Sequence, residues 1–136
     1  MGMVQMMIAT STGGNESALA AVDVPSDGAI VGIDWAVRAD LDADGEFFDA
    51  QLSFGATRSG VNDSRQVISG CSAQNYLLTS GAAVSAVNKF VGPLKVQVFS
   101  GERLYLHCNA SAGVVAVISA WLYYDFDVSR PGLRRS

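Results

Sequence analysis

The residues best suited to chemistry in this sequence form a short acidic run that ends in glycine. Its three carboxylates are Asp40, Asp42 and Asp44, and Gly45 follows, which is the spacing of the first half of a calcium-binding loop. In such a loop the twelfth position is a bidentate glutamate, and helices flank the loop. Here the twelfth position is Gln51, and the flanking segments alternate as strands do. We therefore favour a plain turn over a calcium site and predict no metal ligands and no cofactor.

A second candidate is His107, the only histidine, which stands beside Cys108 and suggests a thiol with its base. The surrounding segment alternates as a strand does, and neighbouring side chains on a strand point to opposite faces. The two side chains therefore cannot pair. We predict that His107 is a surface or interface residue on the same face as Arg103 and Tyr105.

Paired carboxylates are the remaining candidates for catalysis, as in glycoside hydrolysis. The pairs on offer are Asp34 with Asp49 and Asp125 with Asp127, but nothing in the sequence fixes either separation. Charged outward faces of strands account for all of them. Because no acid and base are predicted in one pocket, we expect no enzymatic activity.

The two cysteines, Cys71 and Cys108, are too few for a disulfide framework or a four-ligand zinc site. We expect buried thiols. A single bridge between them stays open as the alternative.

Composition limits the classes of partner. The 136 residues are 49% hydrophobic and 16% charged, which is enough apolar surface for one folded domain. The net charge of −4 is opposite to the basic surface that nucleic acid requires. The apolar runs at 1–9 and 114–124 are too short to cross a bilayer. We predict neither a nucleic-acid nor a membrane partner.

The elements that position these residues are strands, because apolar residues recur at every second position. On either side of the 40–45 turn the predicted inward residues are Val31, Ile33, Trp35 and Val37, then Phe48, Ala50, Leu52 and Phe54. This alternation across a polar turn predicts a hairpin. The carboxyl third predicts a meander through 94–99, 104–108 and 114–126, with the last strand the longest.

Further strands are expected at 4–8, 19–24, 64–69 and 76–79, whereas segment 82–91 fits a helix or a strand equally well. About eight short strands with regular turns predict an all-β, single-domain antiparallel β-sandwich that is jelly-roll-like. The sandwich is expected over residues 1–128, with residues 1–16 as an alternative N-terminal arm. Residues 129–136 form a basic C-terminal tail.

The last strand is unusual because both of its faces are apolar, whereas a strand of a two-layer sandwich buries only one. The second face must therefore be covered. We favour another subunit, since Trp and Tyr often anchor such contacts. The alternative is the amino-terminal arm of the same chain. The predicted subunit interface consists of Val115, Val117, Trp121 and Tyr123.

Two segments, Gly101-Glu102-Arg103-Leu104-Tyr105-Leu106-His107 and Ala120-Trp121-Leu122-Tyr123-Tyr124, resemble the closing meander of small β-sandwich virion proteins of tailed bacteriophages. Those proteins include capsid decoration (cement) proteins and head-fibre or tail-fibre domains. Ile33-Asp34-Trp35 with Asp42-Ala43-Asp44-Gly45-Glu46 is similar to their first hairpin.

The resemblance implies a non-enzymatic structural protein on the capsid surface of a virion. It would be a homotrimer that stabilises contacts between major capsid proteins. The basic tail, with Arg130, Arg134 and Arg135, is then a candidate for capsid docking, although a solvated terminus fits it equally well.

A second class of function uses the same fold. In a receptor- or carbohydrate-binding module at a fibre tip, exposed aromatic side chains stack on sugars, and acidic side chains bind hydroxyls or calcium. We keep this class as the alternative to capsid decoration.

Overall fold

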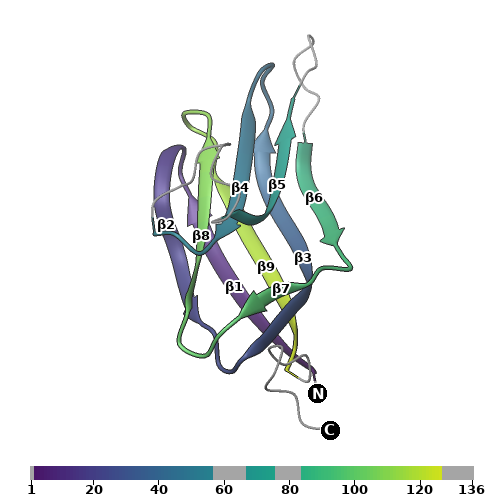
Figure 1. Cartoon of the computed structure of the whole chain (residues 1–136). Coiled ribbons are helices and arrows are strands. Elements are labelled where there is room, and N and C mark those ends of the chain that lie inside the picture. Colours follow the sequence, from purple (N-terminus) through teal and green to yellow (C-terminus); the bar gives the residue numbers. More distant parts are fainter. Residues whose placement is uncertain (1, 57–66, 76–83, 127–136) are drawn as a thin grey trace, which may run out of the picture.

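The computed structural model describes residues 2–56, 67–75 and 84–126. Two antiparallel sheets pack face to face in this part of the chain (Figure 1). Their strands are β1 (Gly2–Ser11), β2 (Gly14–Asp23), β3 (Gly28–Leu41), β4 (Phe47–Ser53), β5 (Val67–Gln74), β6 (Val84–Val91), β7 (Val96–Val98), β8 (Arg103–Ala110) and β9 (Ala116–Asp125). No helix capable of spanning a membrane occurs among the described residues.

The strand order decides which residues share a surface. Sheet A has the order β1-β9-β3-β6, with β7 also paired to β3, and sheet B has the order β2-β8-β4-β5. The chain changes sheet at most connections, so strands that are neighbours in sequence face each other across the core. The prediction of an all-β, antiparallel, jelly-roll-like sandwich is confirmed.

The core lies between the sheets because each strand turns every second side chain inward. The largest fully buried side chains come from both sheets: Met7, Ile30, Ile33, Trp35, Leu41, Phe48, Leu52, Leu104, Leu106, Ile118, Leu122 and Tyr124. Trp35 of β3 also donates its indole N–H to Ser69 Oγ of β5 over 3.2 Å, which links the two sheets. The inward positions predicted for Ile33, Trp35 and Val37, and for Phe48, Ala50 and Leu52, are confirmed.

The hairpin predicted across residues 40–45 is wrong, because β3 lies in sheet A and β4 in sheet B. The connection is a capped turn. Glu46 Oε1 accepts hydrogen bonds from the backbone N–H groups of Asp42 and Ala43, both over 2.9 Å, and Gly45 has a φ of 85°. Alternation marks the buried face of a strand but does not name its hydrogen-bonded partner. A connection of this length can cross the roughly 10 Å between two packed sheets.

The predicted carboxyl-terminal meander is wrong for the same reason. β7 pairs with β3 in sheet A, β8 lies between β2 and β4 in sheet B, and β9 returns to sheet A between β1 and β3. The longest strand is β3, with 14 residues against 10 for β9. The open segment 82–91 contains a strand, β6, and the predicted strand at 76–79 lies outside the described residues.

A β-bulge in β3 corrects the predicted facing of Val31. The register with β9 shifts between Ile30 and Gly32, so Ile30 and Ile33 both point inward and are 0% exposed. Val31 is only half-buried. A bulge adds one residue to a strand and so reverses the alternation on one side of it.

The structure settles the state of the two thiols. Cys71 of β5 and Cys108 of β8 both pair in register with Ala50 of β4, so two interstrand spacings, about 10 Å, separate them. A disulfide requires Cα atoms closer than about 7 Å, and both cysteines are free and buried.

We predict that neither thiol reacts in the folded protein. Burial raises the pKa of the Cys71 thiol, which further lowers its reactivity. Titration with a thiol reagent should give no fast reaction in native buffer and two equivalents per chain in urea. Fast reaction of one equivalent in native buffer would contradict the buried position of both sulfurs.

Tyr124 of β9 makes stability sensitive to alkaline pH. Its side chain is 2% exposed, its hydroxyl donates to Gln5 Oε1 of β1 over 2.6 Å, and burial raises its pKa to about 12. The phenol ionises near pH 10 in an unfolded chain. The folded protein therefore holds this proton more tightly than the unfolded chain does. Its contribution to stability is complete below about pH 10 and is lost as the pH rises from about 10 towards 12.

We predict that the free energy of unfolding of the wild-type protein falls between pH 9.5 and 11.5, and that Tyr124→Phe makes this fall shallower. Urea unfolding curves at several pH values measure both slopes. Equal slopes for the two proteins would show that Tyr124 does not cause the alkaline loss.

Candidate assembly interface

The outer face of sheet A, which points away from the core, is apolar. Nine large hydrophobic side chains in the described part of the chain are exposed, and most of them gather on this face instead of being scattered. They are Val4, Met6 and Ile8 of β1, Phe90 of β6, Val117 and Trp121 of β9, and Val115 just before β9. We call these residues, together with Tyr123, the apolar face of sheet A.

The register of β9 with its neighbours joins these side chains into one surface. Trp121 lies opposite Met6 of β1 on one side and opposite Asp34 of β3 on the other. Tyr123 lies opposite Val4. Directly opposed side chains in an antiparallel pair have Cβ atoms about 5 Å apart. The aromatic residues of β9 therefore touch apolar residues of β1 instead of standing alone.

Two glycines extend the apolar face of sheet A to β6. A Cβ at Gly32 would come within 2.8 Å of the Phe90 ring, and one at Gly92 within 2.7 Å. A side chain at either position would push the ring away from its place against the sheet. There it makes an edge-on contact with Tyr123, with ring centroids 6.2 Å apart and an interplanar angle of 69°. Phe90 is nevertheless 61% exposed.

The four residues predicted from the sequence as a subunit interface lie together on this face. Val115, Val117 and Trp121 are 49%, 38% and 40% exposed, and Tyr123 is half-buried. The alternative, in which an amino-terminal arm covers the last strand, is wrong. β1 lies beside β9 and forms the edge of the same sheet.

Sequence reasoning missed the contributions of β1 and Phe90 to this face. The alternation of Val4, Met6 and Ile8 is visible in the sequence, but only the pairing of β1 with β9 shows that their side faces outward beside Trp121. Nothing near Phe90 in the sequence signals its contact with Tyr123.

Charged residues border one end of the apolar face of sheet A. Arg38 and Asp40 of β3 line a shallow depression of about 320 Å³ together with Val115 and Val117. Asp34 lies within the face itself, opposite Trp121 on one side and Phe90 on the other.

The acidic run predicted as a turn lies at the connection from β3 to β4. Asp40, Asp42 and Asp44 are all exposed. No group of three or more His, Cys, Asp or Glu side chains within residues 2–56, 67–75 and 84–126 could hold a metal ion. At this connection the backbone N–H groups of Asp42 and Ala43 donate to Glu46 Oε1, and the N–H of Gly45 donates to Asn75 O over 2.8 Å.

His107 is buried, so its predicted place at the surface is wrong. Its side chain points to the outer side of sheet B, whereas that of Cys108 points to the core, as strand alternation predicted. The His107 side chain is nevertheless 0% exposed. Its Nδ1 accepts a hydrogen bond from the backbone N–H of Ala18 over 2.7 Å, and its Nε2 lies 2.8 Å from Gly55 O and 3.0 Å from Ser53 Oγ. The loop after β4 and an irregular segment of β2 thus cover the ring. Strand alternation alone cannot reveal such a cover.

These contacts define the chemical role of the ring. Because Nδ1 accepts, Nε2 carries the proton and donates to Gly55 O, so the imidazole is neutral. Ala18 has a φ of 54°, at a place where the register of β2 with β8 shifts. The histidine therefore holds a strained backbone position instead of serving as a base for Cys108.

Of the two carboxylate pairs considered for catalysis, the pair Asp34 and Asp49 is separated by the fold. Asp34 lies on the outer side of sheet A, opposite Trp121, whereas Asp49 lies on the outer side of sheet B. The two therefore lie on opposite sides of the sandwich. Asp127 and the basic tail with Arg130, Arg134 and Arg135 lie outside the described residues.

No protein-family model matches the chain, and no curated protein matches it in sequence. Several solved structures are similar in fold. Pili from Bacillus endospore appendages are 10% identical, with 90% of this chain and 87% of that chain covered and a TM-score of 0.38. Eiger TNF from S. frugiperda is 13% identical, with coverage of 96% and 99% and a TM-score of 0.44. A chain of infectious bursal disease virus, Gx strain, is 12% identical, with coverage of 95% and 39% and a TM-score of 0.43. These likenesses concern the fold alone.

Proposed function

We propose that this protein is a non-enzymatic structural subunit of a virion that assembles as a homotrimer through the apolar face of sheet A. The observation that carries the proposal is the gathering of exposed hydrophobic side chains on one sheet face, centred on Trp121. Exposed hydrophobic side chains that form one contiguous surface, instead of being scattered singly, mark interaction sites.

The occupant of this face is a second copy of the chain. Aromatic residues are enriched at the centres of stable interfaces, and here Trp121, Tyr123 and Phe90 lie close together. Among the described residues, the charged side chains on the outer side of sheet A include Asp34, Arg38 and Asp40 of β3 and Asp125 of β9. Burial of this face adds apolar contacts to a small domain and covers the edge strand β1.

The capsid part of the proposal comes from the resemblance to tailed-phage virion proteins. On that basis the trimer is a decoration subunit on the capsid surface. It stabilises contacts between major capsid proteins, and the basic tail contributes to docking.

Light scattering at several protein concentrations, with and without calcium, tests the assembly. The expected mass is three times the 14.3 kDa of the chain, unchanged by dilution or calcium. A 14.3 kDa species at every concentration would contradict it. Copies of the chain on purified virus particles, in a fixed ratio to the major capsid protein, would support capsid decoration.

A further inference from the structure

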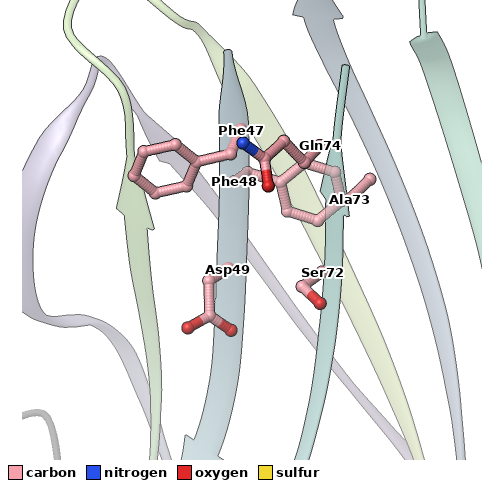
Figure 2. Close-up of a pocket in the computed structure, with 6 residues that line it drawn as sticks. All are labelled: Phe47, Phe48, Asp49, Ser72, Ala73 and Gln74. Carbon is pink, nitrogen blue, oxygen red and sulfur yellow. The ribbon is translucent and has the colours of Figure 1, made fainter. Parts of the chain in front are cut away.

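The outer face of sheet B carries a depression whose chemistry differs from that of sheet A. It is open, has a volume of about 480 Å³, and lies over β4 and β5 (Figure 2). The side chains around it are Phe47 and Asp49 of β4 and Ser72 and Gln74 of β5, with Phe48 and Ala73 completing the lining. Pockets for small ligands have volumes of about 300–1,000 Å³.

The register of the two strands arranges these side chains in two rows. Phe47 lies opposite Gln74, and Asp49 lies opposite Ser72. Alternate residues of a strand are about 7 Å apart, and opposed residues have Cβ atoms about 5 Å apart. An aromatic ring and an amide thus form one row, and a carboxylate and a hydroxyl form the next, as Figure 2 shows. Asn109 of β8 lies opposite Asp49 and continues the polar row.

Backbone hydrogen bonds fix this end of the two strands. The backbone N–H of Phe47 donates to Ser111 Oγ over 3.0 Å, and the N–H of Ser111 donates to Phe47 O over 3.1 Å. The N–H of Asn75 donates to Glu46 O over 2.8 Å. The site is therefore held in place before any ligand binds, which lowers the entropic cost of binding.

The four side chains select the class of ligand. Phe47 offers an apolar π face with partial negative charge. Ser72 and Gln74 each donate and accept hydrogen bonds, and Asp49 accepts them. A sugar ring presents C–H groups on its face and hydroxyl groups around its rim, which complements this arrangement. The carboxylate of Asp49 and the net charge of −4 disfavour an acidic sugar.

From this arrangement we infer that the outer face of sheet B binds a neutral saccharide. Asp49 is the one carboxylate among the described residues that line the depression. Hydrolysis of a glycosidic bond uses a pair of carboxylates, and the inference concerns binding of the saccharide, not its cleavage. Sheets A and B form the two layers of the sandwich (Figure 1). The depression over β4 and β5 and the apolar face of sheet A are on the outer sides of different layers. The saccharide site and the apolar face of sheet A therefore consist of different residues, and each can be tested by its own variants.

Titration of the full, ¹⁵N-labelled chain with cellobiose, maltotriose and N,N′,N″-triacetylchitotriose, followed by NMR, tests the inference. Sialyllactose serves as the acidic probe. We expect at least one neutral probe to shift the amide signals of Phe47, Ser72 and Gln74, with a dissociation constant of about 1 mM because the site is open. Sialyllactose should bind at least tenfold more weakly. The inference is overturned if no neutral probe shifts these signals well above that concentration, or if the shifts lie elsewhere.

Variants separate the site from unspecific binding. Phe47→Ala should weaken binding at least tenfold, and Asp49→Asn, which keeps the shape, should weaken it severalfold. Phe99→Ala is the matched control, because Phe99 is also partly exposed but lies at the other end of β8. If a folded Phe47→Ala protein binds the saccharide with wild-type affinity, the assignment of the site is wrong. Light scattering on the same samples reports assembly separately, so either proposal can fail without the other.

Discussion

Replacement of Trp121 by glutamate is expected to convert the trimer into a 14.3 kDa monomer. Trp121 is 40% exposed, and its neighbours across the sheet are Met6 and Asp34. In an assembled face the introduced carboxylate would be buried beside the carboxylate of Asp34 without a cation. Burial of an uncompensated charge costs several kcal/mol, which is a loss of more than a hundredfold in association.

The fold should survive this substitution, since the Trp121 side chain points away from the core. Light scattering gives the mass, and circular dichroism checks that the sheets remain. The matched control is Phe99→Glu, because Phe99 is 36% exposed but lies in the turn between β7 and β8. We expect the control to keep the wild-type mass. A folded Trp121→Glu protein that stays trimeric would exclude the apolar face of sheet A as the interface.

Replacement of His107 by leucine is expected to lower the free energy of unfolding by about 3 kcal/mol. Leucine fills most of the volume of the ring but makes none of its hydrogen bonds. The backbone N–H of Ala18 then loses the acceptor 2.7 Å away, and Gly55 O loses its donor. A buried polar group left unsatisfied costs about 1–3 kcal/mol. Ala18 also loses the contact that holds its backbone in a strained conformation, with a φ of 54°.

His107→Asn is the informative comparison. Its Oδ1 occupies the position of Nδ1 and can accept from Ala18, whereas its side chain is too short to reach Gly55. We expect His107→Asn to lose only about half as much free energy of unfolding as His107→Leu, as measured by urea unfolding. Amide exchange should be faster at Ala18 in the leucine variant than in the asparagine variant. If the His107→Leu and wild-type proteins have equal free energies of unfolding, the hydrogen bonds of His107 make no net contribution to stability.

The sequence by itself determined the class of fold and the inward side of most strands. Alternation has a period of two and is local, so it marks Ile33, Trp35 and Val37 as core without reference to the rest of the chain. The same local signal showed that both faces of the last strand are apolar. It therefore located Val115, Val117, Trp121 and Tyr123 on one surface before their neighbours were known.

Only the tertiary structure decided which strands pair. Hydrogen-bonded pairing is non-local, and a short turn can join two strands of one sheet or cross between two sheets. For this reason the segments predicted to form a hairpin and a meander instead alternate between sheets A and B. For the same reason two features stayed invisible in the sequence: the cover over His107 and the depression formed by Phe47 and Asp49 with Ser72 and Gln74. Each depends on contacts between segments that the chain brings together only when both sheets are formed.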